Sequence, residues 1–227
     1  MTSADGGQRE LILQVATRLF AALGYDATSV SQIAEAAGLD IAAITGSVGS
    51  KRDLYLAVME RAHQAELTGL ERSVREIAAA APEETTAAVH RLIDDYIDFC
   101  TQNSEFPALW MHRWLFDASD VTELDRHYVQ PLVQYVTEAL APLTSGSTDL
   151  KYVIWSVIWC THAFARGGVL DEDGNRVGPE DPETLRRFRA YLHQMLHCVL
   201  TLPGDAPPAP GGPPPAPGPP PPLGGPF

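Results

Sequence analysis

Basic residues are scarce in this chain. Its 227 residues include 16 lysines and arginines against 29 aspartates and glutamates, which gives a formal net charge of −13 at pH 7. A surface with this excess of negative charge does not generally attract nucleic acids or anionic membranes. Binding to either polyanion would therefore have to be local and specific.

Long apolar runs and a basic leader are also missing. No apolar stretch reaches the roughly 18 residues that a membrane-spanning helix needs, and the start, MTSADGGQRE, does not have the pattern of a signal peptide. The only cysteines, Cys100, Cys160 and Cys198, lie far apart within apolar stretches. This pattern is typical of reduced core residues, so we expect a cytoplasmic protein without membrane contact.

Sequence motifs for catalysis and metal binding are absent as well. There is no glycine-rich phosphate loop, nucleophile elbow or zinc-ligand pair at usable spacing. His193 and His197 stand four residues apart, but without an acidic or third ligand nearby a surface or interface pair is favoured. The segment DEDGN at 171–175 has its glycine misplaced for a calcium loop, which favours an acidic surface turn. We expect no enzyme, no cofactor and no metal site.

Helical periodicity dominates the rest of the chain. Apolar residues from Leu11 to Leu23 recur on one helix face that ends at Gly24. From Lys51 to the alanines before Pro82 no breaker occurs, which predicts one long helix. Further helices are predicted at 85–101, 106–117, 121–140, 148–165 and 182–200. Pro131 should break or kink its helix, and no strand alternation is visible, so the sequence predicts an all-α fold.

Three helix starts fall within the segment from Thr28 to Leu54. The patterns S-x-x-Q at 29–32 and S-x-x-D at 50–53 have the spacing of capping boxes, and Asp40 is a further N-cap. Gly38 stops the first short helix and opens a tight turn. Two short helices joined in this way indicate a helix-turn-helix, a module that lays one helix in a groove of DNA.

The segment from Ile12 to Met59 resembles the N-terminal domain of the TetR family of transcriptional repressors. The resemblance rests on an ordered set of short motifs: LF at 19–20, Gly24, TSV at 28–30, IA at 33–34, AG at 37–38 and SKRDL at 50–54. It implies a homodimer with an inducer pocket in the C-terminal domain. The chain departs from the family's usual residues at Asp40, Thr45, Ser47 and Val48.

Four parts of the chain follow from these patterns. We expect a disordered N-terminus at 1–7, a helix-turn-helix DNA-binding domain at 8–54, and a helical ligand-binding and dimerisation domain at 55–202. In the remaining segment, 203–227, 13 of 25 residues are proline and six are glycine. Such a composition cannot form a core, which predicts a disordered, partly polyproline II tail.

The second helix of the motif is the expected DNA-reading element. We place Ile41 to Ser47 in the major groove of an operator, with Lys51 on a phosphate. The candidate DNA-contacting residues are Thr28, Ser29, Gln32, Ile41, Ala42, Ala43, Thr45, Gly46, Ser47 and Lys51. Because only Thr45 and Ser47 in that helix carry hydrogen-bonding side chains, a competing hypothesis is a small-molecule-binding or interaction protein that has lost ordinary DNA affinity.

Aromatic residues are concentrated on two predicted helices. Phe106, Trp110 and Trp114 repeat every four residues on one helix, and a second helix carries two more tryptophans on one face. The candidate ligand-binding residues are Phe106, Trp110, Arg113, Trp114, Tyr128, Tyr135, Trp155, Trp159 and His162. Aromatics at this spacing are usually core residues, and it is the family resemblance that implies a pocket for a small apolar or aromatic effector.

The helix predicted at 148–165 is apolar nearly all round. A helix buried on every side needs neighbours on every side, and in a domain of this size some of them are expected to come from a second subunit. The helix at 182–200 repeats its apolar residues at close to heptad spacing. We therefore expect a homodimer through these two helices, with a central helix of a monomeric core as the alternative. Together with these patterns, the family resemblance implies a ligand-responsive repressor.

Overall fold

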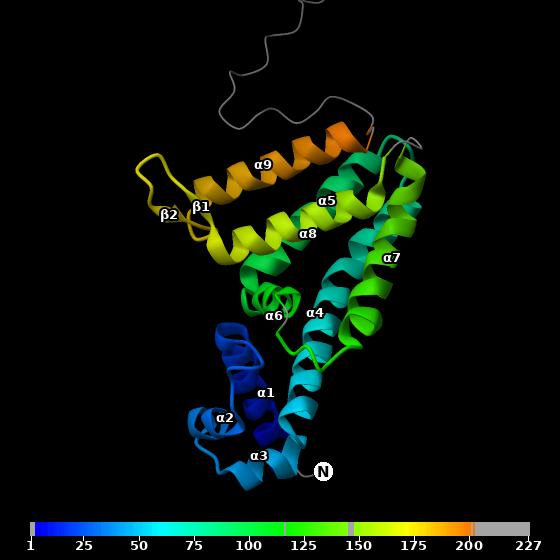
Figure 1. Cartoon of the computed structure of the whole chain (residues 1–227). Helices are drawn as coiled ribbons and strands as arrows, with labels where there is room; N and C mark the ends of the chain where they lie inside the picture. Colours follow the sequence, from blue (N-terminus) through cyan, green and yellow to red (C-terminus); the bar gives the residue numbers. More distant parts are fainter. Residues whose placement is uncertain (1–2, 116, 145–147, 201, 203–227) are drawn as a thin grey trace, which may run out of the picture.

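The structure, a computed structural model, describes residues 3–115, 117–144, 148–200 and 202. A small domain made by the first helices hangs from a larger helical body, and the long helix α4 joins the two (Figure 1). None of the helices in the described ranges has the length and apolar character that crossing a membrane requires. The Pro/Gly-rich segment at 203–227, for which we expected disorder, lies outside the described residues.

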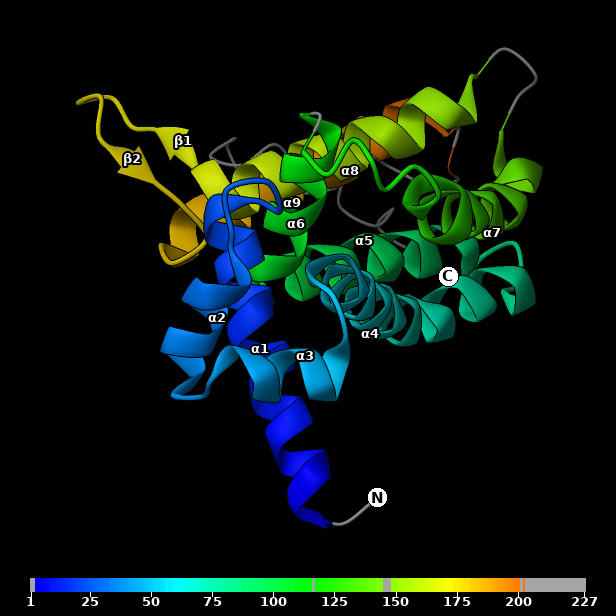
Figure 2. The ribbon, with the colours of Figure 1, turned by 60° about the horizontal axis from the view of Figure 1, so that its bottom comes forward.

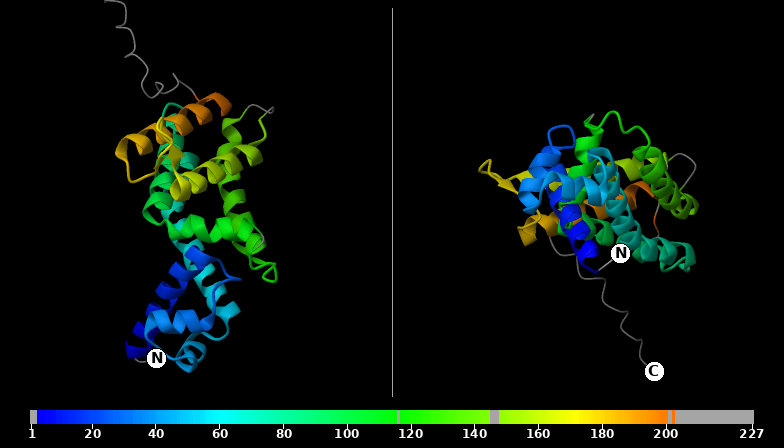
Figure 3. Two further views of the ribbon diagram at one scale, coloured as in Figure 1. Left: turned by 60° about the vertical axis from the view of Figure 1, so that its left-hand side comes forward. Right: turned by 90° about the horizontal axis from the view of Figure 1, so that it is seen from below.

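The all-α prediction is confirmed. The helices are α1 (Ser3–Leu23), α2 (Val30–Ala37), α3 (Ile41–Val48), α4 (Lys51–Ala79), α5 (Thr85–Gln102), α6 (Glu105–Trp114), α7 (Gln130–Leu140), α8 (Leu150–Gly167) and α9 (Pro182–Val199), with short turns η1 (Asp125–Val129) and η2 (Ala141–Leu143). The left view of Figure 3 shows that α1 to α3 protrude from one end of the body, and the right view looks at that end from below.

The helix-turn-helix begins and ends at the capping residues that the sequence indicated. The Ser29 Oγ accepts a hydrogen bond from the Gln32 backbone N–H at 3.2 Å, and the Gln32 side chain accepts one from the Ser29 N–H at 2.7 Å. Asp40 caps α3 by accepting from the Ala43 N–H at 2.7 Å. Since these bonds satisfy backbone donors that a helix start leaves open, local sequence sets where α2 and α3 begin.

Gly38 ends α2 in the left-handed region, with φ 67°. A Cβ at this position would have no atom within 4 Å, so alanine would meet no collision, only the backbone strain of about 1 kcal/mol or more. We expect Gly38→Ala to lower the free energy of unfolding by about 1 kcal/mol in a urea titration. Gly46 is equally open but helical, so Gly46→Ala is the control and should not destabilise the protein. Equal losses in the two variants would contradict this account.

The described residues form two buried cores, and α6 belongs to the first. The first core contains Phe20, Tyr25 and Tyr55, with the Phe20 and Tyr55 rings edge to face at 5.2 Å between centroids. It also takes in Leu109 and Trp110 from α6, which lies across the end of α1 (Figure 2). The second core is formed by α4, α5, α7, α8 and α9. The small domain is therefore packed against the body rather than tethered by α4 alone.

The expected interruption at Pro131 is a widened turn. Residues 125–129 form one π-helical turn, and α7 follows directly, with Pro131 in its first turn. Proline has no N–H to donate to the preceding turn and its ring crowds that turn, so the backbone widens there. The helix predicted at 121–140 is thus shorter and starts later than expected.

Two sequence expectations are corrected by the structure. Helix α1 begins at Ser3, inside the segment 1–7 where we expected disorder, because extending an existing helix adds a hydrogen bond for each residue fixed. Strands are also present: β1 (Val169–Leu170) pairs antiparallel with β2 (Arg176–Val177). Two-residue strands are too short to show alternation in a sequence. The acidic segment 171–175 is the turn of this hairpin.

Candidate functional site

Helix α3 lies at the end of the small domain that is farthest from the body (Figure 1), and its exposed residues are mostly apolar. Ile41 is 51% exposed, and Ala42 and Thr45 are exposed beside it. The buried Ile44 anchors the opposite face of the helix in the first core. The Thr45 hydroxyl donates to the Ile41 carbonyl at 3.0 Å, so its methyl group and its oxygen both remain on the helix surface.

One candidate DNA-contacting residue is excluded by burial. Thr28 is 1% exposed, and its hydroxyl donates to the Gly24 carbonyl at 2.6 Å. It therefore holds the turn after α1 instead of facing solvent. The neighbouring candidates Ser29 and Gln32 are exposed, although their side chains are engaged in the capping box of α2.

Lys51 lies against the turn between α1 and α2. Its amine is 4.2 Å from the centroid of the Tyr25 ring and 3.5 Å from the Asp26 carbonyl oxygen. Cation–π contact and a carbonyl acceptor hold the charge on this side of the domain. Arg52 is exposed next to it, while the acidic caps Asp40 and Asp53 lie on the same helix-turn-helix, so positive charge on this surface is limited to a small area.

An apolar cavity lies in the body. Its empty volume, including its opening to solvent, is about 840 Å³. It is bounded by α4, α5, α7, α8 and the ends of α6 and α9, and its lining consists of Glu66, Leu70, Val89, Leu92, Ile93, Tyr96, Trp110, Trp114, Tyr128, Val129, Leu132, Val133, Val136, Leu140, Val153, Ile154, Val157, Ile158, His162, Leu196 and Leu200.

Four of the candidate ligand-binding residues line this cavity: Trp110, Trp114, Tyr128 and His162. The Trp110 and Trp114 rings stack with centroids 6.4 Å apart, and the His162 ring stacks on Trp114 at 5.2 Å. The aromatic spacing on α6 therefore places two of its rings at the cavity wall. That these residues bind a ligand stays a prediction.

The other candidates lie outside the lining. Phe106 packs edge to face on His162, behind the wall, and Trp155 packs edge to face on Trp114. Trp159 is 50% exposed on the outer face of α8, and Tyr135 is not among the lining residues. Arg113 is occupied elsewhere. Its guanidinium donates to the Ala118 carbonyl at 2.8 Å and to the Asp125 carboxylate at 3.0 Å, because both groups belong to the segment that follows α6.

Sequence reasoning missed the polar groups of the cavity that matter most. Glu66 on α4 is 7% exposed, and burial raises the pKa of its carboxyl to about 8. It stands midway between Ala62 and Leu70 on the apolar stripe of α4. The sequence signal that could have indicated a buried acid was therefore a glutamate at a position of α4 where the helical pattern calls for an apolar residue.

A buried hydrogen bond spans the cavity wall. The Tyr96 hydroxyl and His162 Nε2 are 2.9 Å apart, and both side chains are buried. Burial lowers the pKa of His162 to about 3 and raises that of Tyr96. Both groups are therefore neutral at physiological pH, so they add polarity to the cavity but no charge.

The end of α6 and the segment after it bind the small domain directly. The Asp117 carboxylate accepts hydrogen bonds from the backbone N–H groups of Tyr25 and Asp26, at 2.5 and 2.8 Å. One turn earlier, His112 Nε2 is 3.2 Å from the Ala21 carbonyl oxygen. Trp114 lies between these two contacts in sequence and lines the cavity, so α6 touches both the cavity and the helix-turn-helix domain.

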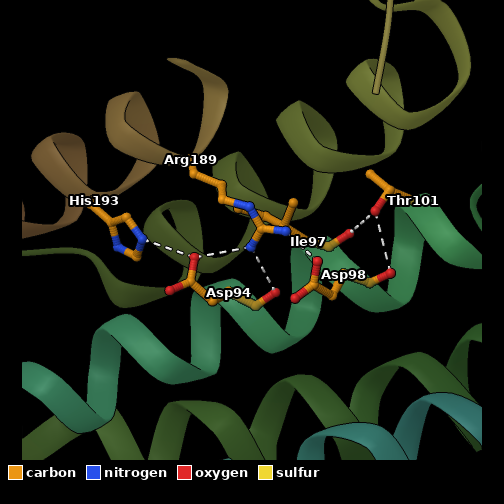
Figure 4. A network of polar contacts seen from close by, with 6 residues as sticks. All are labelled: Asp94, Ile97, Asp98, Thr101, Arg189 and His193. Atoms are coloured by element: carbon orange, nitrogen blue, oxygen red, sulfur yellow. Dashed lines mark hydrogen bonds and ion pairs between the residues drawn. The ribbon is translucent and has the colours of Figure 1, made fainter. Parts of the chain in front are cut away.

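A polar network fixes α9 on α5 (Figure 4). The Arg189 guanidinium pairs with Asp94 at 3.1 Å and also with Asp98, while His193 Nε2 lies 3.0 Å from the same Asp94 carboxylate. His193 is thus held by an acidic partner of a neighbouring helix, one that lies 99 residues away in the sequence. This network makes the position of α9 rigid relative to the wall of the cavity.

The two features of the site are an exposed helix-turn-helix and an apolar cavity in the helical body that carries it. Residues 12–58 match the family described as bacterial regulatory proteins, tetR family. This segment thus resembles the DNA-binding domain of that family, as the sequence motifs indicated, and no curated protein matches the chain.

Solved structures share the fold at low sequence identity. AibR in complex with isovaleryl coenzyme A and operator DNA is 19% identical with a TM-score of 0.62, over 85% of this chain and 98% of that chain. A TetR-like transcriptional regulator from a Rhodococcus species is 17% identical with a TM-score of 0.56, over 83% and 95%. PfmR from Thermus thermophilus is 19% identical with a TM-score of 0.55, over 73% and 85%. At these identities the likeness establishes the fold.

Proposed function

We propose that the protein is a cytoplasmic, dimeric repressor whose affinity for an operator is controlled by a small apolar molecule bound in the body cavity. We also propose that it has no catalytic role. The observation that carries this proposal is the double contact of α6. Trp110 and Trp114 form part of the cavity wall, while His112 and Asp117 bond to the turn and helix that precede the recognition motif. A ligand that displaces Trp114 would act on the small domain through a path of direct contacts.

The coupling follows from differential affinity. A ligand shifts the position of the small domains only if it binds one arrangement more tightly than the other. Two recognition helices of a dimer must lie about 34 to 36 Å apart to occupy successive major grooves. A change in the α6 position alters this spacing through Asp117 and releases the operator. The structure of AibR with both isovaleryl coenzyme A and operator DNA supports the idea that this fold can combine the two binding functions.

Helix α3 is the proposed reading element. The exposed side chains of Ile41, Ala42 and Thr45 would contact base edges, with apolar groups against thymine methyls. Lys51, Arg52 and the backbone amides at the starts of α2 and α4 would hold phosphates. Ser29, Gln32, Ala43, Gly46 and Ser47 remain proposed neighbours of the DNA backbone, whereas Thr28 is buried.

Two variants distinguish residues that recognise bases from residues that contact phosphates. We expect Lys51→Ala to weaken binding to all DNA sequences by about tenfold at low salt and to reduce the salt dependence by about one counterion. Thr45→Ala should instead change the preferred base at one position of each half-site, because it removes a surface hydroxyl from the reading helix. Gel shifts of the two variants against operator duplexes with single base changes measure both effects. Identical behaviour of the variants and the wild type would rule out this docking.

The competing hypothesis is that the protein has this fold and binds a small molecule or a partner, but no longer binds an operator. It is favoured by the net charge of the small domain, since residues 1–60 carry four basic and seven acidic side chains. A gel shift with the DNA upstream of the protein's own gene at low salt decides between the two. Binding that survives excess competitor DNA supports repression, and none over the micromolar protein range would favour the alternative.

A dimer through α8 and α9 is part of the proposal. Tyr152 and Trp159, seven residues apart on α8, are 61% and 50% exposed, and Tyr191 on α9 is 53% exposed. These aromatics are exposed on α8 and α9, two helices that lie side by side (Figure 1). Such apolar area on neighbouring helices is typical of an interface.

We expect Trp159→Glu to convert the dimer into a monomer, because it places a charge at the centre of this aromatic area. Leu115→Glu is the matched control, since Leu115 is 77% exposed but lies after α6, away from α8 and α9. Size-exclusion chromatography with light scattering measures both masses. A Trp159→Glu variant that stays dimeric at micromolar concentration would exclude this interface.

A further inference from the structure

We propose that the effector of the body cavity is an apolar cation, of the class of hydrophobic ammonium compounds, whose positive end lies beside Glu66. This inference rests on the proposed effector role of the cavity and names the chemistry that the cavity would select. It follows from the charge, the ring faces and the shape of the lining residues.

The ionisable charge in the cavity lining is acidic, with no positively charged counterpart among the described residues. Among its described lining residues Glu66 is the sole carboxylate, and none is a lysine or an arginine. An anionic ligand would meet a buried acid without any positive partner, which is costly in an apolar environment. A cation would provide the charge that the ionised form of Glu66 lacks. The cavity therefore selects against carboxylates and phosphates and in favour of positive groups.

The aromatic residues of the wall fit the same class of ligand. Trp110, Trp114 and Tyr128 line the cavity, and tryptophan is the side chain whose ring face attracts cations most strongly. A weakly hydrated ammonium group with apolar substituents loses little on leaving water and contacts these rings over their faces. The remaining wall is built mainly of leucine, isoleucine and valine from α5, α7, α8 and α9, which would surround an apolar tail.

Glu66 also gives this binding a pH signature. Burial raises the pKa of Glu66 to about 8, so the empty cavity holds a neutral acid at neutral pH, and a bound cation releases its proton. The other titratable groups near Glu66 do not change their charge in the same pH range. Burial raises the pKa of Tyr96, Cys100 and Tyr128 above their ordinary values, and lowers that of His162 to about 3 and that of His63 below 6.5. Between pH 6.5 and 9 the acid that changes charge here is Glu66.

Three probes that share the same ten-carbon tail but differ in head group test the proposal on the full chain in the absence of DNA. Decyltrimethylammonium, decanol and decanoate, each below its micelle concentration, are titrated into the protein and followed by tryptophan fluorescence and calorimetry. We expect the cation to bind about tenfold or more tighter than the other two at pH 8.5, and its affinity to rise about 25-fold from pH 6.5 to 8.5 before it levels off. Tighter binding of decanoate or decanol, or a flat pH profile for the cation, would overturn the proposal.

The variant Glu66→Gln assigns the effect to this residue. It should remove both the preference for the cation and the pH dependence, while still binding decanol. Glu60→Gln, at an exposed position of the same helix, is the matched control and should behave as the wild type. A cation preference that survives Glu66→Gln would contradict the assignment. Since no step uses DNA, a failure here is distinct from a failure of operator binding.

Discussion

Glu66→Gln is expected to stabilise the protein at pH 7 by on the order of 3 kcal/mol. The side chain is 7% exposed, and burial raises the pKa of its carboxyl from 4.5 to about 8. Between these two values the unfolded chain has lost the proton that the folded chain still holds. The wild type therefore loses stability as pH rises from 4.5 toward 8, by about 1.4 kcal/mol for each unit. Glutamine cannot ionise, so the variant escapes this loss.

Urea unfolding of the wild type and the variant at several pH values measures the difference. It should be close to zero near pH 4, where Glu66 is protonated in both states, grow through neutral pH, and stay constant above pH 8. Glu60→Gln, on the exposed side of α4, should show no comparable gain. A gain of equal size at pH 4 and pH 8 would mean that packing, rather than protonation, separates the two proteins.

Asp117→Ala is expected to disconnect the cavity from the helix-turn-helix. Its carboxylate accepts from the backbone N–H groups of Tyr25 and Asp26, and hydrogen bonds to a charged group contribute about 1.5 to 3 kcal/mol each. Because one bond is only partly buried and the other is exposed, the variant should lose a smaller total, about 2 to 4 kcal/mol of unfolding free energy. It should also keep DNA binding at low temperature while losing the effect of the cationic probe on that binding.

Asp120 provides the control for this variant. It carries the same charge on the same segment but is exposed, so Asp120→Ala should change neither stability nor ligand response by a measurable amount. Thermal unfolding and gel shifts with and without decyltrimethylammonium give the two readouts. An Asp117→Ala protein whose operator binding still responds to the probe like the wild type would exclude this contact as the transmission path.

The small domain could be predicted from sequence because its determinants are local. Ser29, Asp40 and Ser50 each accept hydrogen bonds from backbone N–H groups three residues further on, and Gly38 occupies the conformation that its place in the turn requires. Such signals depend on spacings of a few residues, which are visible in one sequence. The helix-turn-helix prediction was accordingly confirmed, residue by residue, at its caps.

The cavity could be predicted only in part because its wall comes from distant segments. The spacing of Trp110 and Trp114 on α6 indicated a shared face, and both line the cavity. The same argument also selected Trp159, but this residue is half exposed on α8 and does not line the cavity. Periodicity tells which residues share a helix face but not what that face contacts. Tyr96 and His162 meet across 66 residues, a pairing that no local pattern encodes.

The coupling contact was beyond sequence reasoning for a related reason. Asp117 lies 92 residues from Tyr25, and an aspartate at the end of a predicted helix is more often a surface residue. Only the position of α6 across the end of α1 brings this carboxylate to the backbone of the small domain. Long-range polar contacts of this type follow from the packing of helices, which the apolar pattern constrains without specifying.

The central claim, that this acidic chain is a dimeric operator-binding regulator, is tested most directly by selecting binding sites from a random duplex library with the full-length protein at low salt. We predict enrichment of a two-fold symmetric site whose half-sites are about one helical turn, 34 to 36 Å, apart. Thr45→Ala should change one base pair of each half-site. No enrichment above that obtained with an Ile41→Asp variant, whose recognition surface carries an added negative charge, would contradict the claim.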